Sequence, residues 1–310
     1  MKLALRPVGQ PGSYFDLIML PGETRSLAVD VANDGDAALV ARTYAANVYT
    51  IINGGFGARL RDEPRSGTTE WLDYSTEVLQ LAAGDRIRRT FAIAVPMDAA
   101  PGEYITSLAL ENDQPFSGSG AVVVNQVVRQ AVAVVVTVPG PRLPGIVIGA
   151  ASHEVVAGTS VVSVAVENTG NVRLKPLVSS VLVDATGSEV SHATVQMDTF
   201  YAHTTTLVQV QLAALMPSGA YTVRLSVGDS GQGMPVSHAD VPLIVAAPSD
   251  SPSAGSAAQG PSGGTQSAGD GRIPLAALGS VLVAGVLCSL YVLLSRGAQR
   301  RNLRAKRSGR

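Results

Sequence analysis

Cysteine, histidine and aromatic residues are scarce in this 310-residue chain. Its one cysteine, Cys288, excludes an intrachain disulfide, so any folded region must be stabilised by packing alone. The few histidines are scattered without the i, i+4 or cysteine spacing of a zinc site: His153, His192, His203 and His238. No glycine-rich loop precedes a helical pattern. These absences argue against an enzyme, and they predict no metal site, no cofactor and no nucleic-acid partner.

A helical period is also missing from the first 245 or so residues, where apolar residues alternate as they do in strands. Leu27, Val29 and Val31 alternate with polar or small neighbours, and a turn over residues 33–35 follows. The β-branched run over residues 122–138 is nearly continuous, which is typical of a buried strand. The sequence therefore predicts an all-β fold.

The second half of this region repeats the first. The segment 21–35, a glycine turn and a strand ending at Asn33, aligns with 157–170, which contains Asn168. The segment 101–110, with Tyr104, likewise aligns with 218–227, with Tyr221. We expect two immunoglobulin-like β-sandwich domains, over residues 10–140 and 143–246. The first has an insertion, residues 53–77, that the second lacks.

One long apolar run lies near the end of the chain. Residues 273–294 carry no charge, and at ~1.5 Å per residue a helix of this length spans roughly 33 Å, enough to cross a membrane. All 24 acidic residues lie at or before Asp270, against 15 basic ones, whereas eight basic residues and no acid follow. Because flanking positive residues stay cytoplasmic, the predicted topology places the N-terminal region outside the cell and the basic tail, residues 295–310, inside.

The segments on either side of this region carry further expectations. Residues 247–271 are rich in serine, glycine, alanine and proline, and we expect a disordered stalk. An extracytoplasmic region needs an export signal, but no apolar run follows Met1, so we expect translation to begin upstream. Small residues recur every fourth position in the predicted span, a seam that favours helix self-association: Ala276, Ser280, Ala284 and Cys288.

The insertion contains the one tryptophan, Trp71, together with several acids. A flat aromatic face stacks on a sugar ring while carboxylates bond its hydroxyls, so Glu70, Trp71, Asp73 and Tyr74 are candidate ligand-binding residues. The alternative is that Trp71 anchors its own loop to the sandwich. A glycosidase needs two carboxylates across a cleft, whereas these acids share one loop.

Several short motifs together resemble the bacterial WxL-interacting proteins. They occur in order over roughly residues 10–140: the segment 12–17, the turn at 21–23, the strand ending at Asn33, the pair 46–47, the segment 53–55, Trp71-Leu72, and Val95-Pro96 before 101–104. This resemblance implies a peptidoglycan-binding first domain, and a second domain that is only loosely similar to the family's host-binding domain. It also implies a surface protein that holds both wall glycan and a partner protein.

Three functions without catalysis remain open. The first is a membrane-anchored, cell-surface protein that binds peptidoglycan and a surface protein partner. The second is a structural spacer that presents nothing specific. The third is an assembly chaperone, in which an exposed edge strand accepts a strand of its partner. Binding to purified wall sacculi distinguishes the first from the other two.

Overall fold

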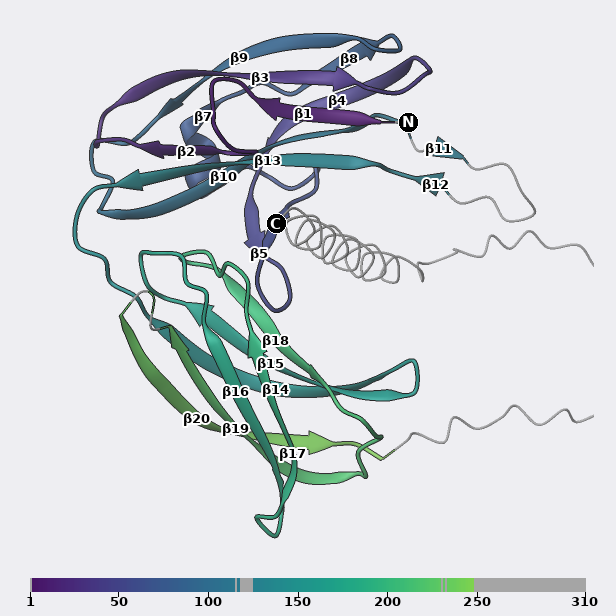
Figure 1. Cartoon of the computed structure of the whole chain (residues 1–310), viewed down its shortest axis with the longest axis vertical. Helices are drawn as coiled ribbons and strands as arrows, with labels where there is room; N and C mark the ends of the chain where they lie inside the picture. Colours follow the sequence, from purple (N-terminus) through teal and green to yellow (C-terminus); the bar gives the residue numbers. More distant parts are fainter. Residues whose placement is uncertain (1, 115, 118–124, 230, 232, 248–310) are drawn as a thin grey trace, which may run out of the picture. The chain divides into compact units, whose positions relative to one another are not determined.

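The computed structural model describes residues 2–114, 116–117, 125–229, 231 and 233–247 (Figure 1). Residues 1–250 form one compact unit. The predicted membrane span, its small-residue seam, the basic tail and the stalk beyond residue 247 lie outside the described residues. Among the residues described, no helix is long and apolar enough to cross a membrane. The all-β prediction is confirmed for this part of the chain.

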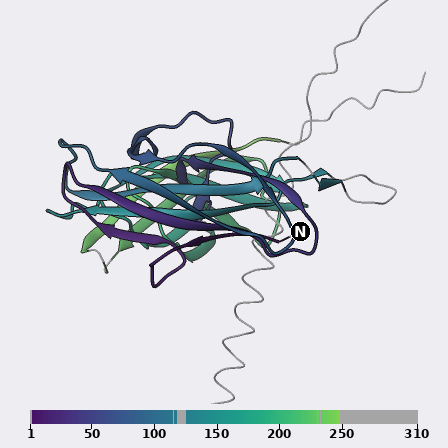
Figure 2. The ribbon, with the colours of Figure 1, turned by 90° about the horizontal axis from the view of Figure 1, so that it is seen from above.

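The first set of strands forms two sheets with the orders β1-β3-β9-β7 and β2-β13-β10-β4-β8. Neighbouring strands are antiparallel except β2, which pairs with β13 in parallel. In Figure 2 these strands run side by side along one direction, as expected of packed sheets. Their bounds are β1 (Leu3–Pro7), β2 (Phe15–Ile18), β3 (Thr24–Asn33), β4 (Leu39–Ala46), β7 (Leu72–Asp73), β8 (Glu77–Leu81), β9 (Arg86–Ala94), β10 (Gly102–Asn112) and β13 (Arg129–Val138).

Short elements lie between these strands. The strand β5 (Val48–Thr50) forms a hairpin with β6 (Phe56–Ala58). The predicted insertion, residues 53–77, contains β6, the 3-10 helix η1 (Gly67–Trp71) and β7. A second small hairpin, β11 (Phe116–Ser117) with β12 (Asn125–Gln126), separates β10 from β13.

The second set of strands also forms two sheets, with the orders β14-β15-β18 and β17-β16-β19-β20. All of their pairings are antiparallel. The bounds are β14 (Ile146–Val156), β15 (Thr159–Asn168), β16 (Leu177–Asp184), β17 (Glu189–Gln196), β18 (Thr205–Gln211), β19 (Gly219–Asp229) and β20 (Met234–Val245).

Each set encloses its own apolar core. Phe15 and Phe91 meet edge to face in the first core, with ring centroids 5.4 Å apart. Phe200, Met197 and Leu225 are buried in the second. Burying one such side chain stabilises a fold by about 1.5–3 kcal/mol, so packing can replace the missing disulfides.

The strand expected over residues 122–138 differs from its prediction. β13 begins at Arg129, and residues 118–124 lie outside the described part of the chain. Its side chains alternate between two faces: Val132, Val134 and Val136 enter the core, whereas Ala131 and Ala133 are half-buried on the outer face. This segment has a nearly continuous apolar sequence because its outward-facing positions 131 and 133 are alanines.

The internal repeat predicted from the sequence joins equivalent strands. Asn33 ends β3 and Asn168 ends β15, both fully buried. Each side-chain amide donates to the carbonyl four residues later, at 2.8 Å and 2.9 Å, and each Oδ1 accepts from the backbone N–H two residues later at 3.0 Å. Tyr104 and Tyr221 both donate to the carbonyl four residues earlier. This tyrosine corner is a feature of immunoglobulin-like sandwiches.

Candidate functional site

The tip of the β5–β6 hairpin contacts the second sandwich through Asn53. The Asn53 backbone N–H donates to the Leu207 carbonyl at 3.0 Å. Its side-chain amide bonds the backbone of Gln209 twice, donating to the carbonyl at 3.2 Å and accepting from the N–H at 2.8 Å. Asn53 therefore forms hydrogen bonds with backbone groups on the outer edge of β18, as a neighbouring strand would.

The residues after Asn53 fit closely against the second sandwich. Gly54 has φ +90, and a Cβ atom there would lie 2.4 Å from the Asp198 carbonyl oxygen. The next N–H, of Gly55, donates to the Thr199 carbonyl at 2.8 Å. A glycine is required at position 54 for both its backbone conformation and its closeness to Asp198.

Glu103, at the start of β10, makes a second contact between the sandwiches. Its carboxylate accepts from the Arg173 backbone N–H at 2.8 Å and lies 3.4 Å from both Arg173 Nε and Arg142 Nη1. The Glu103 N–H donates to the Asn171 carbonyl, while the Asn171 side chain donates to the Pro101 carbonyl, at 2.8 Å and 2.9 Å. Residues before and after the linker between β13 and β14 are therefore joined by side-chain contacts.

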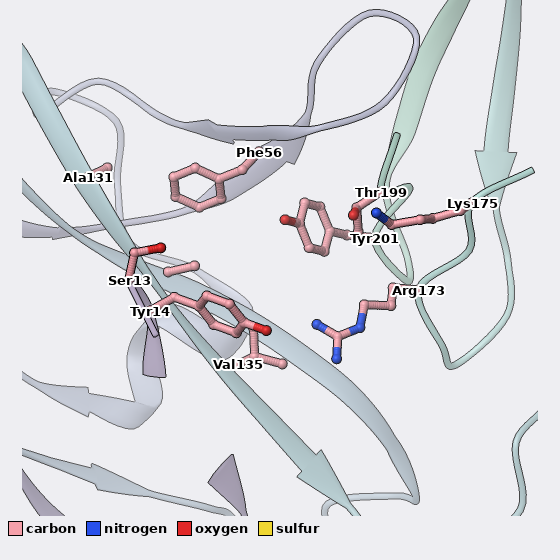
Figure 3. Close-up of a pocket in the computed structure, with 10 residues that line it drawn as sticks. Ser13, Tyr14, Phe56, Ala131, Val135, Arg173, Lys175, Thr199 and Tyr201 are labelled. Atoms are coloured by element: carbon pink, nitrogen blue, oxygen red, sulfur yellow. The ribbon is translucent and has the colours of Figure 1, made fainter. Parts of the chain in front are cut away.

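A pocket of about 470 Å³ lies between these two contacts. Its walls combine aromatic rings, small apolar side chains and two cations (Figure 3). The lining residues are Ser13 and Tyr14 before β2, Phe56 on β6, Ala131, Ala133 and Val135 on β13, and Arg173, Lys175, Thr199 and Tyr201 from the second sandwich. No carboxylate is among them.

The polar groups of the pocket point inward. Figure 3 shows the Arg173 guanidinium and the Tyr14 hydroxyl turned toward each other, and the Tyr201 hydroxyl directed into the space beside Phe56. Burial raises the pKa of Tyr201 to about 12, so its hydroxyl stays protonated and able to donate. Lys175 Nζ lies 3.2 Å from Asp198 and remains largely exposed. The pocket can therefore offer several hydrogen-bond donors, while Glu103 and Asp198 already pair with its two cations.

An open sheet edge adjoins the pocket. β10 pairs with β13 along its whole length to Arg129, whereas β2 pairs only with residues 134–137. Within the described chain, no strand pairs with residues 129–133 of β13 on the β2 side, although the Gln130 side chain accepts a hydrogen bond from the Leu5 N–H of β1 at 3.2 Å. The Thr137 carbonyl accepts from the Met19 N–H on the β2 side at 3.1 Å, so by alternation the backbone groups of Ala133 and Ala131 face that edge.

The loop of Trp71 is anchored to the first sandwich. The Trp71 ring packs on Tyr104, with centroids 4.6 Å apart, and against the first core. The Arg65 guanidinium donates to the carbonyls of Thr69, at 2.6 Å, and Leu72. These contacts favour the anchoring interpretation of Trp71, although part of its ring stays exposed beside the exposed side chains of Glu70 and Asp73.

Tyr74 does not share that surface, which corrects its grouping with Trp71. It is 2% exposed, and its hydroxyl bonds the Thr43 hydroxyl at 2.6 Å. Its ring meets Phe91 edge to face at 5.7 Å and carries the Arg89 guanidinium 4.3 Å above its centroid. Tyr74 directly follows β7 and is buried like Leu72, two residues earlier, whereas Asp73 between them is exposed. In the described part of the chain, no group of three or more His, Cys, Asp or Glu residues could hold a metal ion.

Sequence reasoning did not find the pocket. Its cations lie about 160 residues after Tyr14 in the chain, and nothing in the sequence indicated that they meet. The one available signal was Asn53-Gly54-Gly55, whose glycines mark a close backbone approach.

No family model and no curated protein matches the chain. Its structure is similar in part to solved fimbrial chaperones. A chain of a chaperone–tip adhesin complex of CFA/I fimbriae biogenesis has 12% identity and a TM-score of 0.32, covering 78% of this chain and 99% of that one. The class 5 fimbriae chaperone CfaA has 11% identity and a TM-score of 0.31, covering 77% of this chain and 99% of that one. The E. coli chaperone DraB has 11% identity and a TM-score of 0.30, covering 77% of this chain and 98% of that one. At these TM-scores the likeness carries no argument about function.

Proposed function

We propose that this chain is a non-enzymatic, membrane-anchored surface protein that binds an extended segment of a partner protein as an added strand. The observation that carries the proposal is the open edge of β13 over residues 129–133. Exposed backbone N–H and C=O groups on an edge form hydrogen bonds with an incoming strand, and the adjoining pocket supplies specificity.

Other edges of the described sheets are less suitable. β18 is occupied by Asn53, and β20 contains Pro242, which donates no backbone hydrogen bond. β17 has an open edge, but the cavity beside it holds only about 10 Å³. A pocket of about 310 Å³ also lies beside β20, lined by Met234 and Val236, but the pocket beside β13 is larger, at about 470 Å³.

A proline on the edge tests the proposal. Ala131→Pro removes an N–H that faces the open edge and spares the ladder with β10, so a partner strand should lose one hydrogen bond and meet the proline ring. We expect binding of a peptide of alternating threonine and valine to weaken about tenfold or more. Thr194→Pro on the β17 edge is the matched control and should leave binding unchanged. If the two variants bind the peptide equally well, the assignment to β13 fails.

Wall binding is a second candidate, favoured by the exposed acids beside Trp71. If this loop stacks on a wall sugar, Trp71→Ala should weaken retention on purified sacculi by about 1–3 kcal/mol while the melting temperature changes little. If Trp71 only anchors the loop, the variant should instead melt several degrees lower and retain its sacculus binding. Measuring both quantities on the one variant separates the two roles.

A further inference from the structure

We propose that Asn53 is a site of spontaneous deamidation, and that this modification permanently releases the β5–β6 hairpin from the second sandwich. Asn53-Gly54 is the one Asn-Gly pair in the 310-residue sequence, and it lies at the tip of that hairpin. The proposal is independent of strand addition at β13, because it uses only the contacts of the hairpin tip.

The chemistry requires only these two residues and water. The Gly54 backbone nitrogen attacks the side-chain carbon Cγ of Asn53. A bond forms between this nitrogen and Cγ while the Cγ–Nδ2 bond breaks, and the side-chain nitrogen leaves as ammonia with the Gly54 proton. Water then opens the resulting succinimide ring to aspartate or isoaspartate, so neither an oxidant nor a reductant is needed. Glycine hinders the attack least, since it has no Cβ atom.

In the docked hairpin both reacting groups are held in place. The Gly54 N–H donates to the Ile51 carbonyl at 2.9 Å. The Asn53 side chain bonds the backbone N–H and carbonyl of Gln209, at 2.8 Å and 3.2 Å. Gly54 also lies so close to Asp198 that a Cβ atom would be 2.4 Å from the Asp198 carbonyl oxygen. Ring closure needs the Gly54 nitrogen to rotate toward Cγ, so the tip must leave β18 before Asn53 can deamidate.

Further hydrogen bonds keep the tip docked. The Thr50 hydroxyl bonds the Thr204 hydroxyl at 2.7 Å and accepts from the Tyr201 N–H at 3.1 Å. The Thr206 hydroxyl donates to the Ile51 carbonyl at 2.7 Å. Because the tip leaves only when these bonds break together, the undocked fraction is small. The rate of deamidation in the native chain falls in proportion to that fraction.

The product of deamidation cannot restore the contact. The asparagine amide both donates to and accepts from Gln209, whereas a carboxylate can only accept. Aspartate at position 53 is charged at neutral pH, so one of its oxygens would face the Gln209 carbonyl oxygen without a proton between them. Isoaspartate also adds a carbon to the backbone, which moves Gly54 away from its place beside Asp198. Release is therefore irreversible.

The first experiment measures deamidation at position 53 in the full-length chain in mildly alkaline detergent solution. Liquid chromatography with mass spectrometry identifies the aspartate and isoaspartate products, and the same chain in guanidinium chloride gives the rate without docking. We expect the native chain to react at least about tenfold more slowly than the denatured chain. Equal rates in the two states, or no reaction in the denatured chain, overturn the proposal.

Two variants test whether docking sets this rate. Gln209→Pro removes the N–H that donates to Asn53, and should raise the native rate to within about threefold of the denatured rate. Thr206→Val removes only the hydroxyl that bonds Ile51 and should raise the rate about threefold. If neither variant reacts faster than the unmodified chain, docking does not protect Asn53 and the proposal fails.

Gln211→Pro is the matched control for the proline on β18. The Leu212 N–H donates to the Ser160 carbonyl on the β15 side, so by alternation the Gln211 N–H faces the same outer edge as the Gln209 N–H. The contacts of Asn53 reach Leu207 and Gln209 but not this residue. The control should react as slowly as the unmodified chain, and a rate equal to that of Gln209→Pro would overturn the link to docking.

The second experiment tests whether deamidation releases the hairpin. Hydrogen exchange of the Gly55 N–H, which donates to the Thr199 carbonyl at 2.8 Å, reports docking. In Asn53→Asp this amide should exchange about tenfold faster than in the unmodified chain. Asn47→Asp is the control, because the Asn47 side chain bonds Pro64 and Ser66 within the first sandwich, and it should leave the exchange unchanged. Slow exchange in Asn53→Asp, or equally fast exchange in both variants, overturns the release.

Discussion

The two sandwiches share one scaffold but differ in what is attached to it. Each ends a ten-residue strand, β3 or β15, in a buried asparagine, and both have a tyrosine corner. Only the first, among the residues described, has a parallel edge strand, β2, and the β5–β6 hairpin. The pocket is built from these additions, from β13, and from the β15–β16 and β17–β18 connections. The comparison shows that the repeat supplies the shared scaffold, while its departures supply much of the candidate site.

Replacing the buried asparagines should have the largest effect and tests whether the sandwiches are equivalent. Asn33→Ala leaves the carbonyls of Ala37, Leu81 and Ala82 without this donor, and Asn168→Ala does the same for Val172 and Phe200. We expect each variant to lose about 3 kcal/mol of unfolding free energy, from chemical denaturation. A loss below 1 kcal/mol in either sandwich would show that the shared geometry is not equally important in both.

A change at the hairpin tip should have a smaller effect, confined to the junction. Gly54→Ala forces a Cβ atom against the Asp198 backbone and strains a residue at φ +90. We expect a loss of about 2 kcal/mol and faster cleavage of the linker at residues 139–145 by protease. Gly158→Ala is the control: it has φ +79 but open space around it, so only the backbone strain of about 1 kcal/mol applies. Equal effects of the two substitutions would mean that the contact with Asp198 contributes nothing.

Lowering the pH should have the smallest effect on the unfolding free energy, and it should act on the first sandwich through Asp30. The hydrogen bond from Arg88, at 2.8 Å, lowers the pKa of Asp30 below its ordinary 3.8. A carboxyl whose pKa is lowered by folding stabilises the native state above pH 3.8, and that stability is lost as the pH falls through the folded pKa. The aligned position in the second sandwich is Ala165. We expect Asp30→Asn to lower the unfolding free energy by about 1 kcal/mol at neutral pH. In this variant the unfolding free energy should also fall less steeply as the pH drops below 3.8. An unchanged pH dependence in this range would contradict this role for Asp30.

Much of the fold was predictable because strands and turns follow local rules. The alternation of Leu27, Val29 and Val31 and the aligned asparagines identified equivalent strands without any tertiary information. The candidate site was not predictable, since Tyr14 and Arg173 meet only after both sandwiches fold. Trp71 attracted attention as the one tryptophan, but rarity does not distinguish a binding ring from one that packs on Tyr104. Burial of Tyr74 likewise depends on which way β7 faces, and two residues of strand do not reveal that in a sequence.

The short reach of β2 along β13 also sets a length. Five unpaired residues at about 3.3 Å each give an edge of roughly 17 Å. Because β2 closes one end of this edge, a strand added there could form a ladder of at most about five residues. Lengthening β2 by two residues toward its N-terminus would shorten the unpaired edge to about three residues, or roughly 10 Å.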